Sequence, residues 1–257
     1  MLFQLLDNVA GRIARLDPAT ETPRMAEQIR KAVPEVFDAM RKHGATDAVI
    51  QMIGLQLGKE SVEIVRQIPG IVSTMRRSIE SGQLPPALGC GMCATLAYLV
   101  QPNDLIPDNT PGGYGFIDDY VILRAGEFEY YSRLGGHARE VEDCRKAIGV
   151  AGSLVPVNLR PSMQLVVNGL STTIQLLLLM PLQVQVMTMQ MIIANPLQAA
   201  MPQAPPGFMP GSGFAVQSLG PQAVYEGRNT WRDGETIGVN FPGGGGVVSN
   251  GRDIFVT

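Results

Sequence analysis

The feature that most constrains this 257-residue sequence is an uncharged run: no Asp, Glu, Lys, Arg or His occurs from Pro161 to Tyr225. Soluble proteins rarely leave an apolar surface of that extent facing water, because such a surface attracts other protein or lipid. We therefore expect the run to be buried. The same chain, identical subunits, a partner protein or a membrane could cover it.

The charge balance and the cysteine content limit the classes of protein that fit. Twenty Lys+Arg against 23 Asp+Glu give a net charge of −3, so the basic footprint of a nucleic-acid partner is missing. The first residues, Met1–Asp7, lack the basic and long apolar regions of a signal peptide. Three cysteines are an odd number and do not suggest a disulfide framework. We expect a cytoplasmic protein, with membrane association as the alternative.

Helical patterns dominate the first 150 residues. Apolar residues recur at three- and four-residue steps from Leu2 to Leu16, which predicts one amphipathic helix. Turn and cap residues predict the later helices. The predicted elements are a helix capped by Thr22 and running to Lys31, one from Pro34 to near Gly44, one from Thr46 or Asp47 to Gly58, and two more separated by Pro69-Gly70 and Pro85-Pro86.

After residue 160 the pattern changes toward β-structure. Asn168-Gly169, Asp233-Gly234 and Asn250-Gly251 stand between apolar or β-branched residues, as in tight hairpins. From Leu182 to Met191, apolar residues alternate with Gln and Thr apart from one phase slip, which favours a strand with a bulge. The Leu, Met and Gln residues between 174 and 194 are also good helix formers.

The span Ile174–Ile193 has the length of a membrane-crossing helix. Four glutamines and Pro181 interrupt it, so a lone transmembrane helix is a poor interpretation. We predict an α+β fold: a helical domain over 1–155, a charge-free apolar segment over 156–200 and a Gly/Pro-rich β-hairpin tail over 201–257.

A specific motif lies in the segment from Ala97 to Leu123. It combines an apolar helix, a Pro-x-Asp-Leu-Ile-Pro-Asp turn and an Asp-Asp pair that opens a second helix. Over residues of about 90–125 the sequence resembles the YkvA-like family, a bacterial domain of unknown function. The resemblance implies a helical hairpin, sometimes membrane-associated, and no established reaction. The motif residues are Pro102, Asp104, Leu105, Ile106, Pro107, Asp108, Pro111, Gly115, Asp118 and Asp119.

The four aspartates of the motif allow two interpretations. In the structural one, Asp104 and Asp108 accept backbone N–H groups in tight turns, and Asp118 and Asp119 favour the start of a helix. In the functional one, all four converge on a divalent cation such as Mg²⁺ or Ca²⁺. We favour the structural interpretation, because short Asp-rich turns usually satisfy backbone groups.

Other chemical candidates are weaker. Cys90 and Cys93 form one Cys-x-x-Cys pair, but the chain offers no second pair for a zinc ion, so helix packing is the preferred interpretation. Nothing in the sequence calls for a cofactor.

We therefore expect a non-catalytic structural or interaction protein, whose charge-free region is buried in a homo-oligomer or a larger assembly with protein partners. An ordinary buried sheet within one monomer is also compatible with that region. A membrane-associated protein is the alternative function, and a metal-dependent enzyme using the aspartates is a more remote one.

Overall fold

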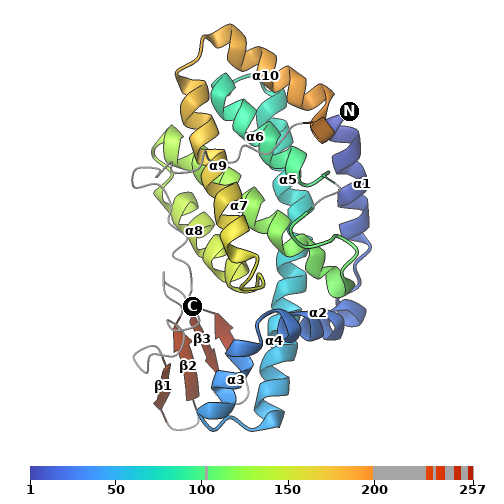
Figure 1. The fold of residues 1–257 in the computed structure, drawn as a ribbon, viewed down its shortest axis with the longest axis vertical. Helices are drawn as coiled ribbons and strands as arrows, with labels where there is room; N and C mark the ends of the chain where they lie inside the picture. Colours follow the sequence, from blue (N-terminus) through green and yellow to red (C-terminus); the bar gives the residue numbers. More distant parts are fainter. Residues whose placement is uncertain (102–103, 199–229, 234–235, 241–245, 250–253, 257) are drawn as a thin grey trace.

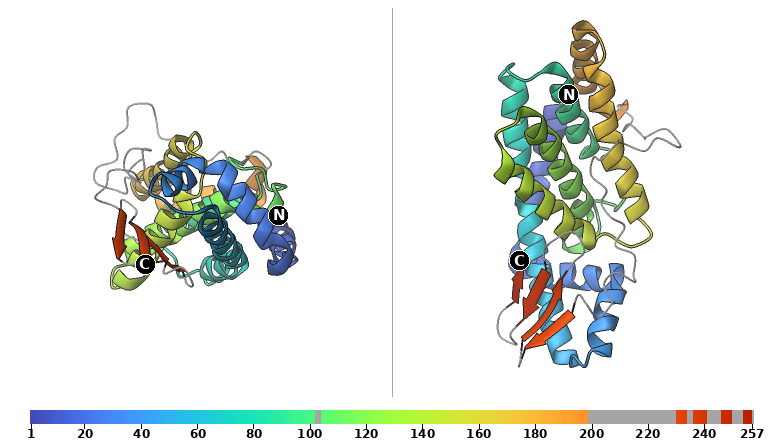
Figure 2. Two further views of the ribbon diagram at one scale, coloured as in Figure 1. Left: turned by 90° about the horizontal axis from the view of Figure 1, so that it is seen from below. Right: turned by 90° about the vertical axis from the view of Figure 1, so that its left-hand side faces the viewer.

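The computed structural model describes residues 1–101 and 104–198, together with the backbone of four short strands between residues 230 and 256. The described chain up to residue 198 is built from helices, which form an elongated body with α10 at one end of its long axis and α3 at the other (Figures 1 and 2). The α-helices are α1 Leu2–Ala14, α2 Pro18–Ala32, α3 Pro34–Lys42, α4 Asp47–Arg66, α5 Ile68–Glu80, α6 Pro86–Tyr98, α7 Ile117–Leu134, α8 Ala138–Ser153, α9 Arg160–Leu178 and α10 Leu182–Ala194; the 3₁₀ helices are η1 Pro111–Phe116 and η2 Pro196–Gln198.

Local sequence signals explain most of the helix boundaries. The stripe predicted in the first helix is buried along α1. Thr46 caps α4 by accepting a hydrogen bond from the N–H of Val49, as expected. The start predicted at Thr22 is wrong, because Asp17 caps α2 through the N–H groups of Ala19 and Thr20. Pro23 therefore lies inside α2.

The predicted end of α4 at Gly58 is also wrong, since the helix continues to Arg66. Gly58 serves close packing instead of termination. A Cβ atom at this position would lie 2.6 Å from the carbonyl oxygen of Thr22 and 2.9 Å from Cβ of Ala26. The missing side chain thus lets α2 cross α4 at close range.

Helices α6 and α7 form the centre of the body. Every residue of α6 from Ala87 to Tyr98 is buried, and α7 is buried over most of its first half. Helices α1, α5, α9 and α10 pack around α6, while α8 packs along α7. The segment that joins α6 to α7 is therefore held between several helices.

The prediction of β-structure in the charge-free segment is wrong, and with it the α+β fold class. Asn168-Gly169 lies within α9, and the alternating residues from Leu182 to Met191 form α10. Asn-Gly specifies a hairpin only between strands, whereas the Leu, Gln and Met residues around it here are good helix formers. The part of the chain that the structure describes has no strand before residue 230.

Near the C-terminus four short strands pair in the order β1-β2-β3-β4: β1 Thr230–Asp233, β2 Thr236–Asn240, β3 Gly246–Ser249 and β4 Ile254–Val256. All three pairings are antiparallel. The predicted turns Asp233-Gly234 and Asn250-Gly251 fall between paired strands, although Gly234, Asn250 and Gly251 lie outside the described residues.

Candidate functional site at the Asp-rich turn

The Asp-rich turn is the segment Asp104–Asp119, which connects α6 to α7 through η1. Its described part is tied to α6 by Tyr98 and Asp118. The Tyr98 hydroxyl donates a hydrogen bond to Oδ2 of Asp118 (3.0 Å) and accepts one from the N–H of Leu105 (3.3 Å). Oδ2 of Asp118 also accepts the N–H of Ile106 at 3.2 Å. Asp118 thus acts as the buried anchor of the turn.

A second anchor comes from the start of the chain. The guanidinium of Arg12 in α1 donates to Oδ2 of Asp108 at 2.7 Å and lies over the ring of Phe116. Arg12 is half exposed, so this ion pair contributes only modestly to stability. Sequence reasoning missed Arg12, because a partner that lies 96 residues away leaves no local signal. The role of Tyr98 could have been predicted from the sequence, since a tyrosine at the end of an apolar helix needs a hydrogen-bond partner for its hydroxyl.

Asp119 has no such anchor. Its side chain is fully buried, and neither Oδ1 nor Oδ2 has a hydrogen-bond partner. Oδ1 of Asp104, Asp108 and Asp118 is likewise buried without a partner. Five buried carboxylate oxygens of one turn are therefore unsatisfied, whereas buried polar atoms in folded proteins nearly always find partners.

Burial and mutual repulsion shift the acidities of these groups. Burial, followed by the charges of Asp118, Asp108 and Asp104, raises the pKa of Asp119 well above its ordinary value. Burial raises the pKa of Asp118 to about 6, although hydrogen bonds from Ile106 and Tyr98 oppose this. Burial and the neighbouring aspartates raise the pKa of Asp104 to about 7. Burial also raises the pKa of Asp108, and its ion pair with Arg12 acts against the shift.

The other motif residues shape the turn. Ile106 is buried and Leu105 packs partly against the same core. Pro111 opens η1, and a Cβ atom on Gly115 would lie 2.3 Å from the carbonyl oxygen of Pro107. Pro102 lies outside the described residues. As expected, Asp118 and Asp119 fall in the first turn of α7.

The cysteines are buried thiols. Burial raises the pKa of Cys90 to about 11, of Cys93 to about 12 and of Cys144 to about 11. The thiol of Cys90 donates to the carbonyl oxygen of Gln185 at 3.0 Å and so connects α6 to α10. Within the described ranges, no group of three or more His, Cys, Asp or Glu side chains is arranged so that it could hold a metal ion.

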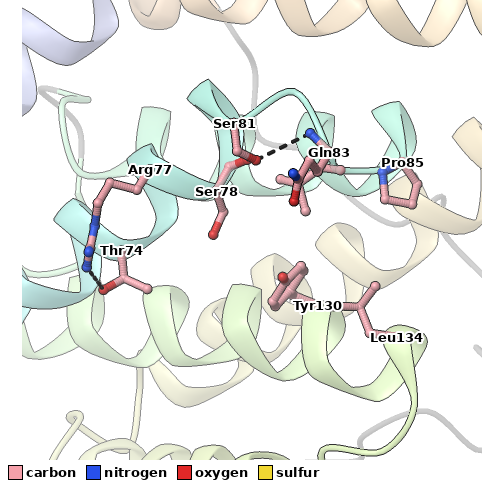
Figure 3. Close-up of a pocket in the computed structure, with 9 residues that line it drawn as sticks. Thr74, Arg77, Ser78, Ser81, Gln83, Pro85, Tyr130 and Leu134 are labelled. Carbon is pink, nitrogen blue, oxygen red and sulfur yellow. Dashed lines mark hydrogen bonds between the residues drawn. The ribbon is translucent and has the colours of Figure 1, made fainter.

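A surface cavity of about 470 Å³ lies between α5 and α7. In Figure 3, Ser78 of α5 and Tyr130 of α7 face it from opposite sides, and Arg77 donates to the hydroxyl of Thr74 at 3.3 Å. No Asp, Glu, His or Cys is among its lining residues, and the ionisable side chains among them are Arg77 and Tyr130. The lining residues are Thr74, Arg77, Ser78, Ser81, Gln83, Leu84, Pro85, Tyr130 and Leu134.

An apolar surface surrounds the bend between α9 and α10. We call it the α9–α10 face and define it by the exposed side chains of Leu176, Leu178, Leu179, Met180, Leu182, Val184, Met187 and Met191. None of the helices in the described ranges is long and apolar enough to cross a membrane.

The architecture around the turn is a helical hairpin: α6, the Asp-rich turn, η1 and the beginning of α7. Residues 90–124 match the family model described as "Protein of unknown function (DUF1232)", which is the YkvA-like family. This match confirms the resemblance carried by the motif and covers the hairpin but not the rest of the chain. Comparisons with curated proteins and with solved structures found no match.

Proposed function

We propose that the protein is a non-catalytic assembly subunit, in which the α9–α10 face packs against the same face of a second copy. The observation that carries the proposal is the exposure of this face. Leu179 is 82% exposed, Met191 65% and Met187 62%, in a segment with no charged residue. A surface of this kind is typical of an interface whose partner is missing.

Helix α10 is apolar both on the side that packs against the core and on the opposite, exposed side. Met189, Ile192 and Ile193 pack toward the core, and the backbone of Gln185 accepts the Cys90 thiol. On the other side, Val184, Met187 and Met191 follow a spacing of three and four residues, which places them along one stripe of the helix. A helix that is apolar on both sides is typical of one buried between two layers, and the described residues supply only one of these layers.

The energy available from covering the face is large enough for a dimer. Full burial of a Leu or Met side chain contributes about 1.5–3 kcal/mol, so covering eight half-exposed ones yields roughly 6–12 kcal/mol before the cost of association. A two-fold interface buries this face on both copies, so the gain doubles to roughly 12–24 kcal/mol and exceeds the cost of association, about 4–15 kcal/mol, over most of that range.

The chemistry of the face favours a second copy over a membrane. Helices that lie on membranes use Lys and Arg toward the headgroups and Trp or Tyr at the interface, and α9 and α10 carry none of these after Arg160. A two-fold interface brings identical residues together, which costs no like-charge repulsion when no charges are present. Methionine side chains adapt well to such surfaces.

The test is the oligomeric state of the full chain in solution, measured by sedimentation velocity over a range of concentrations. We expect a dimer or a larger closed oligomer. The double variant Leu179→Glu, Met187→Glu should weaken association by at least about a hundredfold, because burying unpaired carboxylates costs several kcal/mol. Leu55→Glu is the matched control: Leu55 is an exposed apolar residue of α4, outside the face, and its variant should associate like the original chain.

Two results would refute this proposal. One is a full chain that stays monomeric and soluble at high concentration. The other is equal association of the double variant and the original chain. Flotation with lipid vesicles distinguishes the membrane alternative: a monomer that floats, and whose flotation the double variant loses, would assign the face to lipid instead.

A further inference from the structure

The unsatisfied oxygens of the Asp-rich turn require a partner. Asp119 is 0% exposed, and neither of its carboxylate oxygens accepts a hydrogen bond. The charges that act on it include those of Asp118, Asp108 and Asp104, which are acidic as well. A carboxylate in such a place is strongly disfavoured unless a positive charge or a proton compensates it.

Among the described residues, Arg12 is the cation that acts on Asp119, and it opposes the neighbouring negative charges only in part. Arg12 is engaged at 2.7 Å with Oδ2 of Asp108, and the Oδ1 atom of the same residue remains without a partner. The hydrogen bonds from Tyr98 and Ile106 both go to Oδ2 of Asp118. The buried oxygens that remain without a hydrogen-bond partner are Oδ1 of Asp104, Asp108 and Asp118 and both carboxylate oxygens of Asp119.

The chemical type of these atoms indicates which ligand they would bind. They are oxygens of four carboxylates, the donor type that hard divalent cations of the Mg²⁺ and Ca²⁺ class prefer. We propose that Asp104, Asp108, Asp118 and Asp119 bind one such cation, which fixes the turn between α6 and α7. The proposal is independent of the assembly role of the α9–α10 face.

Binding requires a local movement. In the described arrangement, no three of these side chains could hold a metal ion together. The proposal therefore requires the carboxylates of Asp104 and Asp108, two partly buried loop residues, to turn toward Asp118 and Asp119 in the first turn of α7. Asp108 would then share its carboxylate between the cation and Arg12. The cation would thus draw the loop onto the start of the helix.

The test uses the full-length protein, stripped with a chelator and titrated separately with Mg²⁺, Ca²⁺ and Mn²⁺ in a calorimeter and in thermal unfolding. We expect one ion per chain and an unfolding temperature that rises with ion concentration. Asp119→Asn should weaken ion binding by at least about tenfold. Asp143→Asn, an exposed position on α8, is the control and should bind like the original chain.

Asp104→Asn provides a second variant at a less buried position, in case Asp119→Asn does not fold; it should also weaken the binding. The absence of binding and of stabilisation by all three ions would overturn the proposal and would leave protonation as the compensation. Equal binding by the Asp104→Asn and Asp143→Asn variants would overturn it too, because the ion would then bind elsewhere.

Discussion

Gly112 and Gly11 show that the surroundings of a glycine determine how its substitution changes the stability of the protein. Gly112 has a φ of +79°, and a Cβ atom there would lie 2.4 Å from the backbone nitrogen of Met25. Gly11 lies in α1 with nothing within 4 Å of the corresponding position. We expect Gly112→Ala to lower the free energy of unfolding by about 2–4 kcal/mol, through strain and steric overlap. Gly11→Ala should raise it by about 0.5–1 kcal/mol. Urea denaturation of both variants checks the pair, and equal effects would contradict the described position of η1 against α2.

The aspartates give the metal-free protein a pH-dependent stability. Their pKa values are higher in the folded state than in the unfolded chain, so the folded state binds more protons between about pH 4 and about pH 7. Stability should therefore fall as the pH rises through this window. Asp119→Asn should reduce the slope and be more stable than the original chain at about pH 8 with a chelator present. The free energy of unfolding at about pH 5 and about pH 8 tests this; a slope unchanged by the substitution would count against a strained Asp119.

At the residue scale, the motif could be predicted from sequence, but its partners could not. The Pro and Asp spacing identified the turn, and the position of Asp118 and Asp119 in the first turn of α7 followed from it. The ion pair with Arg12 and the burial of Asp119 depend on how α1 and α7 pack against the loop. Contacts of this range leave no trace in local spacing.

At the scale of elements, α9 and α10 pack closely against small residues of helix α6. A Cβ atom on Gly91 would lie 2.5 Å from Cδ1 and 2.7 Å from Cγ1 of Ile174 in α9. We expect Gly91→Val to push α9 outward and to cost about 1–3 kcal/mol of stability. Gly149→Ala, which meets nothing within 4 Å, serves as its control and should not destabilise the protein. Protease sensitivity of α9, together with urea unfolding, checks this; an unaffected Gly91→Val variant would contradict the close packing of α6 and α9.

Element types were predictable where amphipathic periodicity and caps agreed, as in α1, α3 and the start of α4. They were not predictable in α9 and α10. These helices are apolar on more than one side, so the period that distinguishes a helix from a strand is weak. The alternation in 182–191 reflects glutamines on several faces of α10 and not the two faces of a strand.

At the scale of the whole molecule, the helical body has its own core, and the α9–α10 face belongs to that body. A chain that ends at Gln198 should therefore unfold cooperatively and retain self-association, because the buried cluster extends from Leu2 to Ile174. Sedimentation velocity of the full and the shortened chain provides the measurement. Stronger association of the shortened chain would mean that residues 199–257 cover the face in the full-length protein, and loss of association would place the interface in those residues.

The lack of ionisable groups on the α9–α10 face determines how an assembly built on it would respond to its surroundings. An interface without charges has nothing for salt to screen, so its strength should hardly change with ionic strength. The driving force would come from water released by apolar side chains, which weakens on cooling. Such an assembly would loosen in the cold and tighten again on warming.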